Sequence, residues 1–224
     1  MDKPRSARAA RTRNDPRKHA TRAAIIETAE SLFGEFGIDG ISLRQIGAAA
    51  GSSNTGVVAY YFGDKDSLVE AIFHYRLPAI DARRAELLLE VTRTGRVNDI
   101  PALVRAMWLP LYEQVNEQGR HSYAGFLSGL IRSNWGPSRI AVNERYAASV
   151  HVAELLSAAV PGEIRPRFAE RLNLSAVMIT GALQLIDQAT LTRTKRATES
   201  RKNNALFDDV LRMVSAALLA TTGE

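Results

Sequence analysis

The sequence predicts an all-α protein in which an N-terminal three-helix, helix-turn-helix domain is followed by a larger helical domain. Through most of the chain, apolar residues recur at the three- and four-residue spacing of a helix, and no stretch sustains the alternation of a strand. Residues 41–66 read as two short helices joined by a tight glycine turn, with a corner after them that starts a further helix. These observations divide the chain into residues 1–20, 21–66 and 67–224.

The composition is that of a globular protein and excludes several kinds of site. Of the 224 residues, 46% are hydrophobic and 24% are charged, as in ordinary soluble domains. Because the chain has no cysteine, disulfides, thiolate metal sites and cysteine nucleophiles are excluded. No apolar run is long enough to span a bilayer, and the N-terminus lacks the apolar core of a signal peptide. We expect a cytoplasmic protein with no cofactor, no metal site and no membrane partner.

The N-terminal segment carries the excess of positive charge. Residues 1–22 contain eight basic and two acidic side chains, a net charge of +6, whereas the whole chain carries +5. Residues 23–66 contain two basic and six acidic side chains, a net charge of −4. Residues 1–20 have no apolar period, which predicts a disordered basic arm. This arm is either a DNA-binding extension that offsets the acidity of its neighbour or a solubilising tail.

Two helices are expected before the glycine turn. Over residues 21–36 a single apolar stripe indicates the first helix, and Gly37 ends it. Ser42 is a suitable N-cap for the second helix, and Gln45 three residues later completes a capping box. Gly51 suits the left-handed residue that ends this helix.

The third expected helix begins near Thr55 and would present its N-terminal end outward. In helix-turn-helix proteins this end enters the major groove of DNA. Asn pairs with adenine through two hydrogen bonds, and the Thr methyl group contacts thymine. The expected base-facing residues are Ser53, Asn54, Thr55 and Gly56. Phosphate contacts are expected from Ser42, Arg44, Tyr60, Tyr61 and Lys65.

Two of these residues have an alternative interpretation that the sequence leaves open. Tyr60 is either a phosphate contact or a core aromatic residue with its hydroxyl group at the surface. Lys65 is either a phosphate contact or a solvated lysine between Asp64 and Asp66.

Beyond the corner at Gly63, the sequence predicts a series of helices. Asp64 caps the first, which Pro78 kinks or interrupts and which then continues with Arg83 and Arg84 exposed. The remaining expected helices cover about 101–117, 122–133, 138–159, 166–190 and the C-terminal apolar stripe from Leu206 to Leu218.

The last two expected helices carry more apolar surface than the single face that a helix needs to pack against one core. Two such helices from each of two chains would form a four-helix interface; the alternative is that both complete the core of a monomer. The residues expected at the interface are Val177, Met178, Gly181, Ala182, Leu185, Leu211, Val214 and Leu218.

Large side chains of the second domain are candidates for a ligand pocket, although each is also suited to an ordinary core. They are Trp108, Tyr112, Phe126, Trp135 and His151. No polar group among them identifies a ligand.

Residues 21–76 resemble the DNA-binding domain of the TetR family of ligand-responsive transcriptional regulators. The resemblance lies in the segment TAESLFGEFGIDGISLRQIGAAAG and then in Val57, Tyr60, Phe62, Gly63, Lys65 and Leu68. It implies that residues 67–224 form a ligand-binding and dimerisation domain. It further implies a homodimeric repressor that binds a palindromic double-stranded DNA operator and releases it when a small-molecule effector enters that domain. The segment SSNTGVVAYYF is one residue longer than the commonest family spacing, and Tyr61 stands where histidine is frequent.

Two other classes of function are weighed against this one. The four histidines are scattered without metal-ligand spacing, and the chain has no glycine-rich phosphate loop or nucleophile elbow. We therefore expect that the protein is not an enzyme. The remaining alternative is an all-helical interaction module whose basic tail binds an acidic protein or a membrane surface.

Overall fold

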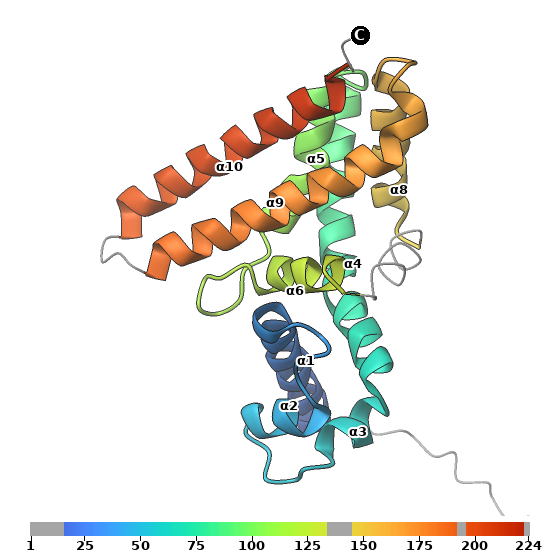
Figure 1. Cartoon of the computed structure of the whole chain (residues 1–224). Coiled ribbons are helices and arrows are strands. Elements are labelled where there is room, and N and C mark those ends of the chain that lie inside the picture. The colour runs from blue at the N-terminus through green and yellow to red at the C-terminus, as the bar shows by residue number, and fades with distance from the viewer. Residues whose placement is uncertain (1–15, 134–144, 192–195, 222–224) are drawn as a thin grey trace, which may run out of the picture.

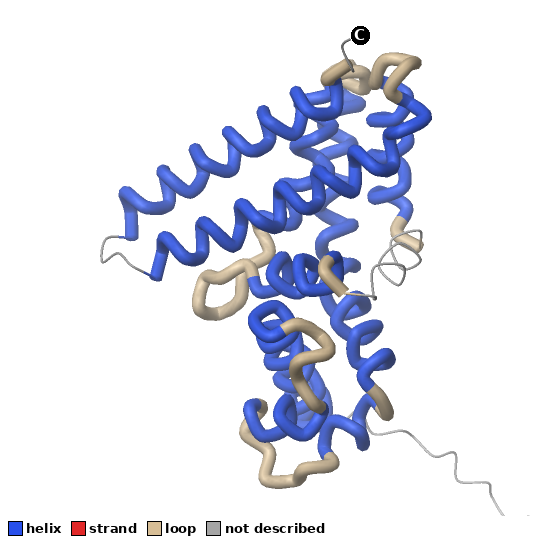
Figure 2. Tube along the Cα trace, in the orientation of Figure 1, coloured by secondary structure: helices blue, strands red, loops and turns tan. Residues whose placement is uncertain are grey.

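The computed structural model describes residues 16–133, 145–191 and 196–221, and within these ranges every regular element is a helix (Figures 1 and 2). The predicted all-α class is therefore confirmed. A small N-terminal domain contains α1 (Pro16–Phe36), α2 (Leu43–Ala49) and α3 (Val57–Phe62). The long helix α4 (Lys65–Arg93) connects it to the rest of the molecule.

The larger domain stacks its helices on the C-terminal part of α4. Its elements are α5 (Ile100–Tyr112), α6 (Ser122–Ile131), α8 (Ala147–Ala159), the 3-10 turn η1 (Arg165–Arg167), α9 (Phe168–Leu191) and α10 (Arg196–Leu219). In Figure 1, α9 and α10 run side by side in opposite directions along one flank, away from the small domain. In the part of the chain that is described, no helix combines the length and apolarity needed to cross a membrane.

Local capping signals place α2 where the sequence predicts it. The Ser42 hydroxyl accepts a hydrogen bond from the Gln45 backbone N–H at 3.3 Å, and Gln45 Oε1 accepts one from the Ser42 N–H at 2.9 Å. Ile41 and Ile46 are both buried beside this cap. Gly51 adopts φ +79°, the left-handed conformation expected after the helix.

The first helix starts earlier than predicted. Residues 16–20, assigned from the sequence to a disordered arm, form the opening turn of α1. Pro16 suits this position because its fixed φ is helical and its missing N–H would have had no partner there. Residues 1–15 of the expected arm lie outside the described ranges.

Helix α4 runs through Pro78 as one helix of 29 residues, capped at its start by Asp64. The Asp64 carboxylate accepts a hydrogen bond from the Ser67 backbone N–H at 2.7 Å, and this bond holds the pKa of Asp64 below its usual value. Pro78 and His74 are both exposed, so water can satisfy the carbonyl that loses its N–H donor. Arg84, expected to be exposed, is buried instead.

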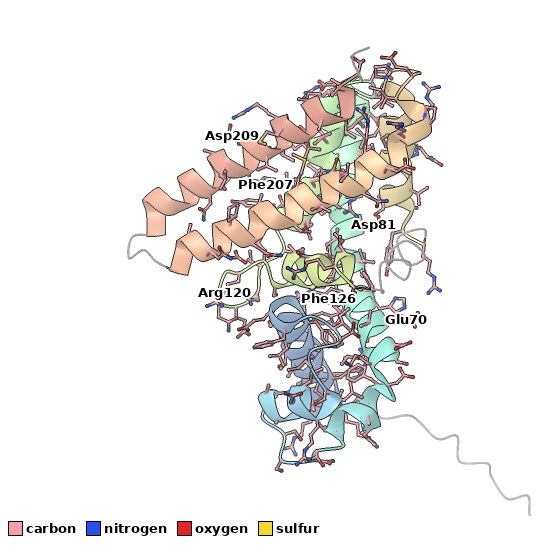
Figure 3. The ribbon with its side chains drawn as sticks, viewed as in Figure 1. Glu70, Asp81, Arg120, Phe126, Phe207 and Asp209 are labelled. Carbon is pink, nitrogen blue, oxygen red and sulfur yellow. The ribbon has the colours of Figure 1, made fainter. Side chains whose placement is uncertain are left out.

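The two domains meet where α6 crosses α1. A Cβ atom built on Gly34 of α1 would lie 2.9 Å from the carbonyl carbon of Gly125 in α6, so the two backbones are in contact. Phe126 fills the same junction, with its ring 6.3 Å from that of Phe33 in α1 and 5.4 Å from that of Phe73 in α4 (Figure 3). The junction is therefore part of one continuous core.

A buried carboxylate links three helices at this junction. Glu30 of α1 is fully buried. Its oxygens accept hydrogen bonds from Arg76 Nε at 2.7 Å, from Arg76 Nη2 at 3.0 Å and from the Ser122 hydroxyl at 2.5 Å. The side chain of Glu30 thus joins α1 to α4 and to the first turn of α6.

Candidate nucleic-acid interface and ligand cavity

The segment that directly precedes α3 is exposed, whereas the helix itself is anchored in the core. Val57, Val58 and Phe62 are buried. Gly47 of α2 allows the close approach, because a Cβ atom there would lie 3.1 Å from Val57 Cγ1. The four residues expected to face DNA bases are all exposed: Ser53, Asn54, Thr55 and Gly56.

A side-chain turn shapes this exposed segment and delays the helix. Asn54 Oδ1 accepts a hydrogen bond from the Gly56 backbone N–H at 2.9 Å, and the Ser52 hydroxyl accepts one from the Asn54 N–H at 3.1 Å. Such local bonds compete with helix formation, so α3 begins at Val57 and not near Thr55. Asn54 therefore presents its amide group from a fixed position, with one lone pair of its oxygen already used.

The tyrosines beyond this turn differ in their exposure. Tyr60 is 73% exposed, which excludes its alternative interpretation as a core residue. Its ring packs edge-on against the ring of Tyr61 with centroids 5.2 Å apart, and Tyr61 is half-buried. Arg44 and Ser42 are exposed on α2, although the Ser42 hydroxyl also serves the helix cap. The predicted phosphate contacts thus lie at the surface, on α2 and α3.

Lys65 is neither a fully solvated lysine nor entirely free to contact a phosphate. Its ammonium group donates a hydrogen bond to the Ile38 carbonyl at 2.8 Å, across 27 residues of sequence. This bond ties the start of α4 to the loop between α1 and α2. The two remaining N–H groups of Lys65 are the ones left for a phosphate.

The start of α1 lies beside α3, a relationship that the sequence did not reveal. The guanidinium carbon of Arg22 is 5.0 Å from the centroid of the Phe62 ring, a cation–π contact. The helical residues Arg17, Lys18 and Arg22 therefore begin at the end of the small domain that carries α3. The only sequence signal for this arrangement was the charge of the segment itself.

The larger domain contains a cavity of about 460 Å³ between α4, α5, α6, α8 and α9, within the size range of small-molecule sites. Its walls are mainly apolar and include Leu77, Met107 and Leu172. Trp108, one of the candidate pocket residues, also lines it. Arg84 and Ser149 contribute polar groups to the same cavity, and neither was singled out in the sequence.

The other predicted pocket residues are not brought to this cavity. Phe126 fills the domain junction described above, and His151 is exposed on α8, 3.8 Å from Glu154. The Tyr112 ring stacks on that of Phe207 at 4.2 Å, and its hydroxyl group donates a hydrogen bond to Asn204 at 2.5 Å. These three side chains are therefore not among those that line this cavity. Trp135 lies outside the described residues.

The buried histidine of the larger domain is paired with a carboxylate and is not part of a metal site among the described residues. The buried His121 lies with Nδ1 2.6 Å from Asp187 Oδ1, and the Asp187 carboxylate also accepts the His121 backbone N–H at 2.8 Å. Among the residues that are described, no three His, Asp or Glu side chains are grouped as metal ligands. The His121–Asp187 pair instead fixes the loop before α6 to α9.

The residues expected at a dimer interface divide into two sets. Val177 and Leu185 are exposed and Met178 and Gly181 are partly exposed, all on α9. The other four are buried within the single chain: Ala182, Leu211, Val214 and Leu218. The three from α10 share the helix face of Phe207, which packs inward. Four further apolar residues that α9 and α10 expose were not predicted at the interface: Leu174, Leu206, Met213 and Leu219.

Comparison with known proteins gives a family match over the small domain and the start of α4. The family model described as "Bacterial regulatory proteins, tetR family" matches residues 25–72. The HTH-type transcriptional regulator BetI of Burkholderia thailandensis is 33% identical over an alignment of 105 positions that covers 42% of this chain and 53% of BetI. BetI of Burkholderia lata is 30% identical over an alignment of the same length that covers 42% of this chain and 54% of the relative. The chain thus spans about half the length of these curated relatives.

A solved structure is similar over a longer stretch at lower identity. NalD, the secondary repressor of the MexAB-OprM multidrug efflux pump in Pseudomonas aeruginosa, is 20% identical. The alignment covers 87% of this chain and 96% of NalD, with a TM-score of 0.41.

Proposed function

This chain belongs to the tetR family of bacterial regulatory proteins, and from that premise we propose that it is a DNA-binding transcriptional repressor. It binds a palindromic double-stranded operator as a homodimer and releases it when a small molecule enters the cavity. The observation that carries the proposal is the exposed polar segment from Ser53 to Gly56, which directly precedes α3 and its buried residues Val57 and Val58.

In this proposal, different residues of the small domain contact the bases and the phosphates. Asn54, held by its bond to Gly56, offers its amide to an adenine edge in the major groove. Arg44 and Tyr60 contact phosphates on either side and set the register. The basic start of α1, together with residues 1–15, adds counterion release that favours any duplex. Two copies of α3 would lie about 34 Å apart, one turn of DNA.

The exposed apolar residues of α9 and α10 support a homodimer. Leu174, Val177 and Leu185 on α9, with Leu206 and Met213 on α10, are exposed on two neighbouring helices. Exposed apolar side chains gathered on neighbouring helices are typical of an interaction site. A second copy of the same helix pair would complete a four-helix bundle.

Leu185→Glu is expected to convert the dimer to a monomer, because a charge would be buried without a partner in the interface. Leu89→Glu is the matched control, since Leu89 on α4 is 70% exposed and Leu185 is 61% exposed. Sedimentation velocity of both variants and the wild type checks this. A dimer that survives Leu185→Glu, or dissociates equally with Leu89→Glu, contradicts the assignment of this face.

Helix α6 provides the connection from cavity to DNA. Tyr123 and Leu127 line the cavity, whereas Gly125, Phe126 and Gly129 of the same helix pack against α1 or α4. A ligand that displaces α6 must therefore displace the small domain and change the spacing between the two α3 helices. Release requires that the ligand bind the two forms with different affinity, of the order of 1–3 kcal/mol for a typical coupling.

Selection of bound duplexes from a random pool tests the function directly. We expect a palindrome with half-sites one helical turn apart. A chain that begins at Pro16 should recover the same palindrome with lower affinity for every duplex. Recovery of unrelated sequences with salt-dependent binding would reject sequence-specific DNA binding and favour the alternative of a basic interaction module.

Two single substitutions are expected to separate the base-reading role from the anchoring role. Asn54→Ser keeps an oxygen that can accept the Gly56 N–H but removes the amide, so it should lose about 1–3 kcal/mol of preference at one base pair in each half-site. Arg44→Ala should weaken binding to all duplexes alike and lower the salt slope by about 1 per half-site. Titration of the selected operator and of single-base variants at several salt concentrations measures both effects. The reverse pattern would show that the two roles are assigned to the wrong residues.

A further inference from the structure

We propose that the cavity takes an amphipathic monocarboxylate, a ligand with an apolar body whose carboxylate is bound by Arg84. This inference rests on the proposed role of the cavity as the effector site and adds the chemical class of the effector. It comes from one unusual residue, an arginine that is buried among apolar walls without a carboxylate partner.

Arg84 is held in place by groups that do not neutralise it. Only 7% of its surface is exposed. Its Nε–H donates a hydrogen bond to the Met107 carbonyl at 3.0 Å, and Nη1 donates one to the Ser149 hydroxyl at 2.6 Å. Both acceptors are uncharged. Two of the five N–H groups of the guanidinium are thereby used, and three remain on the Nη1 and Nη2 side.

The acidic side chains near Arg84 interact with other groups. Asp81, one turn earlier on α4, accepts hydrogen bonds from the Ser149 backbone N–H at 2.8 Å and from the Ser149 hydroxyl at 3.0 Å (Figure 3). It therefore caps the start of α8, and no carboxylate of the described residues forms an ion pair with Arg84 within 4.0 Å. Glu154 at the edge of the cavity has a largely exposed side chain beside His151.

The charge of Arg84 persists despite its burial. Loss of solvent lowers the pKa of Arg84 to about 10, against which the neighbouring Tyr123 and Asp81 raise it. The guanidinium is therefore cationic at neutral pH, and a buried cation without an anion costs free energy that a bound anion would recover.

The remaining walls define the rest of the ligand. Leu77, Ile80, Leu111 and Ala176 offer apolar surface for a hydrocarbon body. Trp108 lines the same cavity, and its indole Nε1–H is buried without a hydrogen-bond partner among the described residues. Two parallel N–H groups of a guanidinium match the two oxygens of a carboxylate. A single cation balances a single negative charge, so a dianion would leave one charge buried and unpaired.

Binding of three ten-carbon probes tests the assignment: decanoate, 1-decanol and decylammonium. By isothermal titration at neutral pH to the full chain without DNA, we expect decanoate to bind at least tenfold more tightly than 1-decanol, and decylammonium to bind most weakly. In Arg84→Met, the preference for decanoate over 1-decanol should disappear while 1-decanol still binds. Arg83→Met is the matched control, since the adjacent Arg83 pairs at the surface with Glu86 and Glu113 and should leave the preference unchanged.

Each result decides the proposal. Failure of decanoate to bind, equal binding of decanoate and 1-decanol by the wild type, or a preference that survives in folded Arg84→Met would overturn it. The wild-type comparison stands even if Arg84→Met does not fold, and circular dichroism reports which case applies.

Release of the selected operator, measured separately, distinguishes the two proposals. If 1-decanol and decanoate release DNA equally well, the regulator function stands and the carboxylate assignment fails. If decanoate binds through Arg84 without affecting operator affinity, the assignment stands and ligand-induced release fails.

Discussion

Replacing Glu30 by alanine is expected to lower the free energy of unfolding by about 3–5 kcal/mol, because it leaves the Arg76 guanidinium largely buried without its anion. In the native structure, the two oxygens of Glu30 accept bonds from Arg76 and from the Ser122 hydroxyl. Burial lowers the pKa of Arg76, but the hydrogen bonds to Glu30 and the negative charges of Glu30 and Glu27 together raise it, so the net shift is upward. The substitution removes that compensation and the link between α1, α4 and α6 together.

Urea denaturation followed by circular dichroism measures this loss as a lower midpoint at an unchanged slope. The matched control is Glu113→Ala, because Glu113 forms an equally short ion pair with Arg83 at 2.8 Å but at an exposed position. Exposed pairs contribute about 0–1 kcal/mol. Similar losses in the two variants would show that burial does not set the strength of the Glu30 pair.

The second large effect is expected at the glycine contact between α1 and α6. Gly34→Ala would place a Cβ atom 2.9 Å from the Gly125 backbone, so one helix must move. Overpacking of this kind costs about 1–3 kcal/mol. Because α6 also lines the cavity, the same displacement should weaken operator binding, as the ligand is proposed to do.

Gly125→Ala, on the opposite side of the same contact, is the control for this experiment. Its Cβ atom would lie 3.7 Å from Gly34 Cα, an ordinary van der Waals distance. Since alanine is favoured over glycine within a helix by about 0.5–1 kcal/mol, Gly125→Ala should be neutral or stabilising. Denaturation and duplex titration of both variants check the pair. Equal behaviour of the two would contradict the backbone contact as a determinant of the domain arrangement.

The features that the sequence predicted correctly depend on neighbouring residues. The capping box of Ser42 and Gln45 and the cap of Asp64 each act over three residues, so a short window of sequence contains the whole signal. The helical class follows from periodicity in the same way. The exposure of residues 53–56 also follows from the sequence, because this polar segment directly precedes the apolar residues Val57 and Val58, which are buried in α3.

The features that were missed depend on contacts between distant residues. Arg84 meets Ser149 across 65 positions, and nothing near Arg84 in the sequence distinguishes it from the surface residue Arg83. Lys65 meets the Ile38 carbonyl across 27 positions. Likewise, α10 has apolar residues on two faces, and the fold buries the face of Phe207, Leu211 and Val214 while it leaves Met213 exposed.

The unbroken course of α4 has a consequence for how the protein denatures. Leu68 and Ile72 near its start are buried with the small domain, whereas Leu77 and Ile80 further along border the cavity. Neither half of the molecule can lose its structure without fraying a helix on which the other depends, so heating should melt both in one cooperative transition. The match to the family model ends at Ile72, inside α4. A fragment cut there would lose Phe73 and Arg76, and with them the partners of Phe126 and Glu30.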